Sequence, residues 1–534
     1  MNKNNLETKT KNLDTGKRVA KSTLALIIFA FVGKVFGFGR ISIMAHYFGA
    51  TADASAFHAS FKATSLFSIL ISSAITTTFI PMLAKVEQAE GPESKNYHAN
   101  NMLFLTMLPA ILISIIGVIF APWLMKIVAG RFDHSVFELS IKLTRISMTG
   151  LVFSAIVGIL TGYLQNEGRF AATGAISIPF NIVYIAYMVL LSRKYGIVGM
   201  SVASVVAVLA QALFLAPYAS RAGLKIRPVF DIKDKYVIEA LVLCAPVLFS
   251  VAINDINSIV NTHIASGLDT NVISVMEYAN RLNILIHGIF ITAITAVAFP
   301  ILSREFSSGN YKNGKRAMST SIKFIMMITI PSTFGLIILA QPMVETLFMS
   351  GKFTQHDANM TAVMLRIYAI ALTAMSLSNI LNRVYYSLQD TLTPLYLGVL
   401  LVSLNIFLNL TLVKFLNYKA LAIAVCVAHN VTILASFYVL HKKIGHIGMK
   451  GYIRTFIKAI MASTVMGFVT KYGFALLSSI VGPSRKFQLL AIIITVILSV
   501  IVYAIMCYAL GMKEFRMIVK AIKRRRKIQE AKNA

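Results

Sequence analysis

Charged residues are scarce in this chain of 534 residues: 13% are charged, 57% are hydrophobic, and the mean hydropathy is +0.73. This composition excludes a soluble multidomain protein and is typical of a polytopic membrane protein. Acidic residues are the scarcest charged class, with 21 against 51 basic residues. The basic residues stand in short clusters between apolar segments, where they indicate membrane topology, so we expect no nucleic-acid partner.

Cysteine and the usual catalytic motifs are also nearly absent. Cys244, Cys426 and Cys507 lie far apart in apolar segments and lack metal or redox spacing, which predicts core residues. The sequence contains no HExxH motif, no Walker motif and no loop long enough for a catalytic domain. We therefore expect a transporter that uses no cofactor, and not an enzyme. The enzyme alternative, a membrane-embedded glycosyltransferase, would need carboxylates at a substrate face, and the predicted outer loops hold few.

The long apolar runs predict an all-α polytopic membrane protein with fourteen transmembrane helices, since each span needs about 20 apolar residues. A basic N-terminus and a basic tail flank these spans. The predicted parts are a cytoplasmic N-terminus (1–21), an N-lobe of six helices (22–218), a basic cytoplasmic linker (219–236), a C-lobe of six helices (237–440), two additional helices (441–511) and a cytoplasmic tail (512–534).

The distribution of Lys and Arg predicts the orientation. With the N-terminus inside, the cytoplasmic segments hold 32 of these residues and the outer loops with their flanks hold 9, which follows the positive-inside rule. We therefore expect a multi-pass protein of the bacterial cell membrane with both termini in the cytoplasm. The basic run at 523–527 predicts a contact with anionic membrane lipids.

An internal repeat relates the two predicted lobes. The segment Ile80–Lys85 (IPMLAK) recurs 219 residues later as Phe299–Arg304 (FPILSR), and Gly130-Arg131-Phe132 recurs 221 residues later as Gly351-Lys352-Phe353. With six spans in each copy, both copies start from the same side of the membrane. The repeats are therefore predicted to be parallel, as in some transporters.

Two cations, Lys34 and Arg40, stand inside the first apolar segment. A charge at the bilayer centre costs about 2.5–3.5 kcal/mol on insertion scales, which makes an intramembrane cation a hypothesis about a pathway or a ligand. The alternative is that the side chains extend to the headgroup region. Gly33 and Gly37 form a GxxxG pattern, which predicts the close approach of a neighbouring helix.

A third cation, Lys62, begins the second predicted span. The repeat offset of 219 carries it to Arg281 at the start of the eighth span, so the two halves present cations at corresponding positions. This pairing, together with the cations of the first span, favours a shared anion-binding site.

The second span also carries a stripe of hydroxyl side chains at every fourth position. The stripe predicts the polar wall of a hydrated cavity, and the alternative is hydrogen bonding between helices. Its members are Thr64, Ser68, Ser72 and Thr76, preceded by Ser60.

Asp255 in the seventh span, with Asn405 and Asn409 one turn apart in the eleventh, suggests an ion site. Carboxylate and amide oxygens bind hard cations, and a buried carboxylate also titrates in proton-coupled steps. The alternative is a polar contact between helices. The isolated histidines His58, His287 and His356 are interpreted as interfacial or cavity residues.

Several short motifs, in order and at matching spacing, resemble those of the MurJ (MviN) lipid II flippases, bacterial members of the multidrug/oligosaccharidyl-lipid/polysaccharide exporter superfamily. The resemblance covers about residues 21–511 and implies fourteen helices in two six-helix lobes, with two extra helices that bound a lipid-tail groove. The motifs are Gly37-Phe38-Gly39-Arg40, Phe48-Gly49-Ala50, Asp53-Ala54, Phe79-Ile80-Pro81, Tyr278-Ala279-Asn280-Arg281-Leu282, Gly351-Lys352-Phe353-Thr354 and Tyr386-Ser387-Leu388-Gln389-Asp390.

The resemblance also implies substrate-binding residues. The family's cavity arginines of the first helix correspond to Arg40 and, with lysine substituted, to Lys34. Its arginine of the eighth span corresponds to Arg281, and its first-loop aspartate to Asp53. Lysine keeps the charge but loses the bidentate geometry that arginine offers a phosphate.

Two departures from the family pattern concern the second helix and the ion site. An arginine pair that some members carry on the second helix is replaced here by Ser68 and Ile69. A sodium site of some members resembles Asp255 with Asn405 and Asn409, although one aspartate of that pattern is Asn409 here.

The resemblance implies a flippase that moves an undecaprenyl-diphosphate-linked disaccharide peptide from the inner to the outer leaflet by alternating access. Coupling to Na⁺, to H⁺ or to the membrane potential stays open, and we expect a monomer. The alternatives are an exporter of another polyprenyl-linked glycan and a cation-coupled multidrug extruder. The cationic residues speak against the extruder, because cationic drugs call for buried carboxylates.

Overall fold

The computed structural model describes residues 32–517. Within its helices, the side chains at 73–74, 76–77, 244–255, 286, 289–290, 292–293 and 296 are outside this description. The first ten residues of the predicted first span and the basic run at 523–527 also lie outside the described residues. The described chain consists of helices and short connections and contains no strand, which confirms the all-α membrane fold.

The helix of residues 32–48 is followed by the other helices of the first repeat and then by those of the second. In the first repeat these are α2 (Ala52–Glu90), α3 (Pro92–Ile119), α4 (Ala121–Ala129), α5 (His134–Met148), α6 (Leu151–Asn166), α7 (Phe170–Gly174), α8 (Ser177–Leu190) and α9 (Ser192–Arg221). The second repeat comprises α10 (Lys235–Ala265), α11 (Val272–Ser307), α12 (Tyr311–Phe348), α13 (Gln355–Ser387), α14 (Leu392–Leu416) and α15 (Lys419–Ile444), and α16 (Met449–Val481) and α17 (Arg485–Ala509) come last.

The helix boundaries reproduce the repeat found in the sequence. α3 begins at Pro92 and α12 at Tyr311, 219 residues later, and the α3–α4 pair ends at Ala129 just as α12 ends at Phe348. The α5–α6 pair spans 134–166, and α13 spans 355–387, which is the same interval displaced by 221. What is one long helix in the second copy is thus broken in the first, at Phe120 and again at the 41° bend between α5 and α6.

Nine of the described helices are long and apolar enough to cross a membrane, and the bent α5–α6 pair makes ten. The other four predicted spans fall on 22–48, α2, α10 and α11. The first of these begins outside the described residues, and the other three contain undescribed side chains. The count of fourteen therefore stays a prediction, while the polytopic membrane fold itself is confirmed.

Two compact units divide the chain between Ser274 and Val275. In the first unit α2 is the central helix, because it contacts α5, α6 and α10. Its core includes Ile75, Phe79 and Leu83 of α2. Since α10 packs on α2 and α4, it belongs by its contacts to this unit, whereas the sequence places it after the lobe boundary at 219–236; that boundary stays a prediction.

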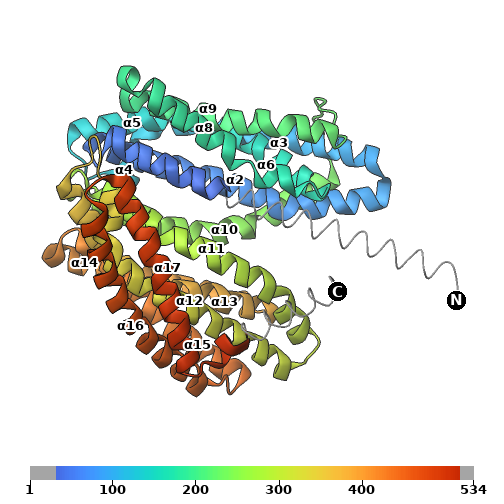
Figure 1. The fold of residues 1–534 in the computed structure, drawn as a ribbon. Helices are drawn as coiled ribbons and strands as arrows, with labels where there is room; N and C mark the ends of the chain where they lie inside the picture. The colour runs from blue at the N-terminus through green and yellow to red at the C-terminus, as the bar shows by residue number, and fades with distance from the viewer. Residues whose placement is uncertain (1–31, 518–534) are drawn as a thin grey trace, which may run out of the picture. The chain divides into compact units, whose positions relative to one another are not determined.

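In the second unit α12 is the central helix, contacting α13, α16 and α17. Figure 1 shows α16 and α17 side by side, in red. The Tyr503 hydroxyl of α17 donates a hydrogen bond to the Met327 carbonyl of α12 at 2.9 Å, deep in the protein. The two additional helices are therefore packed into the core of this unit. Cys426 and Cys507 are buried as predicted, and the Cys244 side chain is not described.

Candidate functional site

The first helix packs closely on α8 through its glycines. A Cβ atom added at Gly33 would lie 1.9 Å from Ser177 Oγ, and one at Gly37 would lie 3.8 Å from Asn181 Nδ2. Only a residue without a side chain permits the first of these approaches. The GxxxG prediction of close helix packing is confirmed, and its partner helix is α8.

The same contact with α8 positions Arg40. Its guanidinium carbon lies 4.8 Å from the ring centre of Tyr184 and 5.6 Å from that of Phe180, and both rings belong to α8. Tyr184 is fully buried. Stacking on two aromatic faces stabilises the cation by about 1 kcal/mol or more where water is excluded. Arg40 is thus held as a half-buried cation in a defined orientation.

Lys34 and Arg40 have different surroundings on this continuous helix. Residues 32–48 are helical throughout, and six residues at 3.6 per turn place the two side chains about 120° apart. The Lys34 side chain is exposed, whereas Arg40 is half-buried against α8. The two cations therefore do not form one compact cluster in this structure.

Asp53 and Lys62 lie on α2. Asp53 is exposed in the first helical turn, next to the N-cap Thr51, whose hydroxyl accepts a hydrogen bond from Ala54 N at 3.3 Å. A carboxylate in a first turn stabilises the helix through its dipole, which gives Asp53 a structural role independent of any substrate. Lys62 is half-buried further along the helix.

Arg281 of α11 is paired with a residue that sequence reasoning missed. Its Nε lies 3.4 Å from Glu277 Oε2, one helical turn earlier, and 43% of its side chain is exposed. The signal was present in the sequence as the i, i+4 spacing of opposite charges. Glu277 therefore competes with any anionic ligand for the Arg281 guanidinium. Such a ligand must displace the Glu277 carboxylate or share the guanidinium with it.

The hydroxyl stripe of α2 faces other helices over part of its length. Ser60 and Thr64 are buried, and Thr64 Oγ1 donates to its own helix at Ser60 O, 2.9 Å away. Ser68 Oγ lies 3.3 Å from Ser154 Oγ of α6. This contact favours hydrogen bonding between helices for Ser68. Ser72 is half-buried and the Thr76 side chain is not described, so the cavity wall stays a prediction.

The candidate ion ligands on α14 are brought together. Asn405 and Asn409 are both buried, and Asn409 Nδ2 donates to Asn405 Oδ1 at 3.0 Å. Two buried amide groups one turn apart fit the oxygen chemistry of a hard monovalent cation. The Asp255 side chain is outside the described residues, so its place in such a site stays a prediction.

A second polar cluster surrounds His287 of α11. Its Nδ1 lies 3.1 Å from Ser376 Oγ, and its Nε2 lies 3.0 Å from Asn379 Nδ2, both on α13. Because an amide nitrogen only donates, Nε2 accepts and Nδ1 carries the proton in this arrangement. His287 therefore makes defined polar contacts between helices, which its isolated position in the sequence did not reveal.

Two serines at equivalent positions of the internal repeat are in contact with each other. Ser55 Oγ of α2 lies 3.0 Å from Ser274 Oγ, and the two residues are 219 positions apart, the repeat offset. Both side chains are fully buried, and Ser274 N also donates to Ser55 Oγ at 3.3 Å. Equivalent positions of the two copies thus meet within the first unit, next to the first turn of α2, which carries Asp53.

Comparison with known proteins places the chain in a family. The family model described as "Lipid II flippase MurJ" matches residues 44–491. The probable lipid II flippase MurJ of Vibrio cholerae is 29% identical over 421 residues, which cover 76% of this chain and 80% of that protein.

Solved structures agree on the fold. "Lipid II flippase MurJ, inward closed conformation" has a TM-score of 0.75 at 20% identity and covers 91% of this chain and 99% of its own. An inward-facing multidrug resistance MATE transporter of the MOP superfamily has a TM-score of 0.66 at 14% identity, with coverages of 79% and 98%.

The family model covers most of the chain, including α2, α11 and the ion-site candidates on α14. The family consists of transporters and not of enzymes, and its members are multi-pass proteins of the inner membrane. The chain belongs to the MurJ family of lipid II flippases.

Proposed function

We propose that this protein moves lipid II, an undecaprenyl-diphosphate-linked disaccharide peptide, from the inner to the outer leaflet of the bacterial cell membrane. The observation that carries the proposal is the family match over residues 44–491. The presence of Lys34, Arg40 and Arg281 in membrane helices agrees with an anionic substrate.

Within this proposal Arg40 is the principal diphosphate ligand. Its aromatic contacts with Phe180 and Tyr184 fix the guanidinium before a ligand arrives, so less side-chain entropy is lost on binding. Lys34 and Lys62 add positive charge on the first two membrane helices. Arg281 of α11 is a further candidate ligand, provided that its contact with Glu277 is exchanged for a phosphate oxygen.

The two lobes rock about the substrate by alternating access, while the prenyl chain stays in lipid. Both termini are proposed to be cytoplasmic, the basic tail to contact anionic lipids, and the protein to act as a monomer. The inside-negative potential favours outward movement of an anion by about 2.3 kcal/mol per charge per 100 mV. Na⁺ at Asn405 and Asn409 with Asp255, or H⁺, is the alternative source of coupling.

The MATE structures raise one other candidate, a multidrug extruder, because they share the fold. Fold alone does not decide function. A cationic drug requires buried carboxylates, whereas the candidate residues on the first two membrane helices are Lys34, Arg40 and Lys62. An exporter of another polyprenyl-linked glycan stays the nearest alternative, because it would use the same diphosphate ligands.

Rescue of a bacterial strain depleted of its own lipid II flippase tests the proposal. The wild-type chain should restore growth, and Arg40→Ala should not, although the variant reaches the membrane at the wild-type level. Arg193→Ala, which removes an exposed cation at the start of α9, is the control and should rescue fully. Failure of the wild-type chain to rescue, or full rescue by Arg40→Ala, would contradict the proposal.

A further inference from the structure

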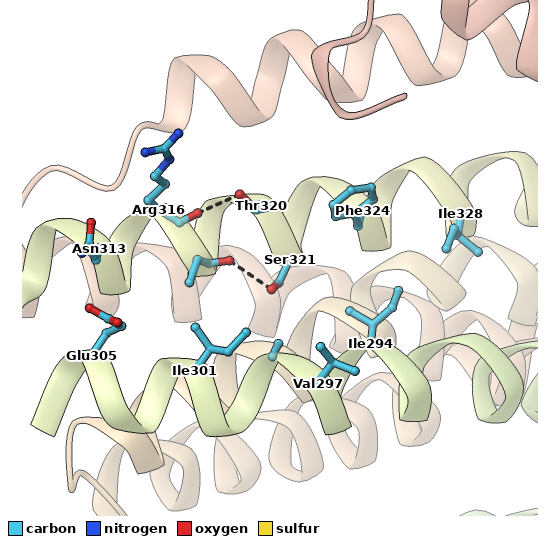
Figure 2. A pocket seen from close by; sticks show the side chains of 12 residues that line it. Ile294, Val297, Ile301, Glu305, Asn313, Arg316, Thr320, Ser321, Phe324 and Ile328 are labelled. Atoms are coloured by element: carbon cyan, nitrogen blue, oxygen red, sulfur yellow. Dashed lines mark hydrogen bonds between the residues drawn. The ribbon is translucent and has the colours of Figure 1, made fainter. Parts of the chain in front are cut away.

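A groove of about 630 Å³ lies between α11 and α12 in the second unit, away from the residues assigned to the substrate. Figure 2 shows the side chains that line it from both helices. Val297 and Ile301 of α11 are 68% and 47% exposed, so the groove presents an accessible apolar wall. Exposed apolar surface in a membrane protein is covered by lipid chains.

The groove has the length of one leaflet. Its lining runs along α12 from Asn313 to Ile328, about 22 Å at 1.5 Å per residue, and along α11 from Ile294 to Glu305, about 17 Å. Half of a bilayer's hydrocarbon core measures about 15 Å. A chain lying in the groove therefore runs from the membrane surface to about the bilayer centre.

The groove is polar at one end and apolar at the other, which matches the polar headgroup and the hydrocarbon chain of a lipid. Figure 2 shows Glu305, Asn313 and Arg316 at one end and Ile294 and Ile328 at the other. By the predicted orientation, the polar end lies at the cytoplasmic surface, where α11 and α12 are joined.

The hydroxyl groups in the middle of the groove do not interrupt its apolar wall. Thr320 Oγ1 donates to Arg316 O at 2.9 Å, and Ser321 Oγ donates to Ala317 O at 3.0 Å. Because both hydroxyls are satisfied by their own helix, they call for no polar partner from the occupant. Beyond the polar end, the lining side chains offer a hydrocarbon chain an apolar surface.

The polar end carries two opposite charges that are not joined to each other. Within the described part of the chain, neither the Arg316 guanidinium nor the Glu305 carboxylate forms an ion pair or a side-chain hydrogen bond. The two charges lie on different helices at the same end of the groove, and Figure 2 shows the Arg316 guanidinium directed away from α11. A ligand that carries an anion and a cationic N–H donor on one flexible headgroup complements both. Of the common headgroups, a phosphate diester bearing a primary ammonium group has this arrangement.

We propose that this groove binds one phospholipid of the cytoplasmic leaflet with an ethanolamine headgroup. Its phosphate accepts hydrogen bonds from Arg316, its ammonium group donates to Glu305, and one acyl chain lies along Ile301, Val297 and Phe324. Choline, which has no N–H, satisfies Arg316 but leaves Glu305 without a donor. The proposal does not depend on the transported substrate.

Titration of delipidated protein, followed by native mass spectrometry, tests this site with phosphatidylethanolamine, phosphatidylcholine and phosphatidylglycerol of identical chains. Wild-type protein should bind phosphatidylethanolamine about tenfold more tightly than phosphatidylcholine, as expected for one charge-assisted hydrogen bond. Glu305→Gln should remove this preference without weakening phosphatidylcholine. Arg316→Gln should weaken both lipids about tenfold.

Two further variants act as controls. Lys312→Gln removes an exposed cation one turn from Arg316 that does not line the groove, and it should leave binding unchanged. Val297→Trp fills the groove from an exposed position and should abolish binding of all three lipids while the melting temperature is kept.

Three outcomes would overturn the proposal. Equal binding of all three lipids, unaffected by Glu305→Gln and Arg316→Gln, would indicate a groove that selects no headgroup. Preference for phosphatidylglycerol would show that Glu305 takes no part. Competitive displacement of the phospholipid by undecaprenyl diphosphate would assign the groove to the substrate's prenyl chain.

Discussion

At the scale of single residues, the chemistry of the candidate site depends on what stands beside each cation. Arg40 lies on two aromatic rings, and Arg281 lies 3.4 Å from a carboxylate. The ring contacts orient the guanidinium of Arg40, whereas Glu277 offsets the charge of Arg281. Two arginines that look equivalent in the sequence are therefore expected to differ in their affinity for a diphosphate.

Gly33 allows a residue-scale test of the packing that positions Arg40. Gly33→Ala places a Cβ atom against Ser177 Oγ, and such overpacking costs about 1–3 kcal/mol. The melting temperature of the purified protein should fall, and the double variant with Ser177→Ala should recover most of the loss.

Gly39→Ala is the matched control for this packing test, because a Cβ atom there meets no atom within 4 Å. Its melting temperature should equal or exceed that of the wild type, since alanine is the better helix former. Equal melting temperatures for the Gly33 and Gly39 variants would show that the close approach to Ser177 is absent from the protein.

The spacing of residues in the sequence predicts contacts within one helix but does not identify the partner residues on other helices. The GxxxG spacing indicates close packing of Gly33 and Gly37 but does not name Ser177, because the partner helix depends on tertiary structure. The spacing of the α2 hydroxyls places Ser68 on a stripe without telling what lies opposite, and that is Ser154. The Glu277–Arg281 pair needed no tertiary information and was accessible from spacing alone.

At the scale of helices, the connections on the predicted cytoplasmic side are tied together by ion pairs. The buried Lys95 at the start of α3 lies 2.7 Å from Glu87 Oε1 and 2.5 Å from Glu167 Oε1, and so joins α2, α3 and α6. Asp234 caps α10 and lies 2.6 Å from His98 Nδ1. These contacts fix the ends of the first-unit helices relative to one another.

Lys95→Met should destabilise the first unit by about 2 kcal/mol. The substitution leaves two carboxylates facing each other, and breaking a buried ion pair costs about 3–5 kcal/mol, less here because Glu87 is 42% exposed. Lys85→Met is the comparison, since the Lys85–Glu239 pair is exposed and worth about 1 kcal/mol or less. Thermal unfolding in detergent measures the stability of both variants. An equal loss of stability in the two would show that the Lys95 ion pairs are worth no more than the exposed Lys85–Glu239 pair.

Asp390, in the turn between α13 and α14, makes a pH-dependent contribution to the stability of the folded protein. Burial raises the pKa of its carboxyl group, but hydrogen bonds from Lys443 and from Thr393 outweigh burial and hold the pKa below its ordinary value. The ionised form is therefore favoured by folding. Its stabilisation is present above the unfolded pKa of about 3.9 and is lost as the pH falls through the folded pKa.

Asp390→Asn tests this contribution. The variant keeps an acceptor for Thr393 N but loses the ion pair with Lys443, so it should be less stable than the wild type by about 1 kcal/mol or less above pH 5. The difference should shrink as the pH is lowered below about 3. Melting temperatures across this pH range provide the measurement. A difference that does not change with pH would exclude ionisation of Asp390 as its source.

The arrangement of helices was largely predictable, because length, hydropathy and repeat spacing determine where spans begin and end. The α12 boundaries repeat those of the α3–α4 pair to the residue. The contacts of α10 with α2 and α4 were not predictable, since every apolar face of a membrane helix looks alike in the sequence. The two breaks in the first copy, at Phe120 and between α5 and α6, were not predicted, although the sequence carries a local signal at each: Pro122 in the first turn of α4 and Gly150 before α6.

At the scale of the whole molecule, the fold is shared with solved structures of a lipid II flippase and of multidrug resistance transporters, so the fold alone does not decide the function. The MurJ structure covers 91% of the chain and the MATE structure 79%. The proposed function follows from family membership and from cations on the first two membrane helices and α11. The candidate cations differ between the units: Arg40 of the first unit lies on aromatic rings, and Arg281 of the second is balanced by Glu277.

The measurement that tests this account most directly is lipid II flipping by purified protein reconstituted in vesicles, with Arg40→Gln and Arg193→Gln compared at equal melting temperature. We predict that the wild type and Arg193→Gln flip lipid II at similar rates and that Arg40→Gln is slower by a factor of about ten or more, as expected for the loss of a charge-assisted phosphate contact. Equal rates for all three proteins, or no flipping by the wild type, would contradict the account.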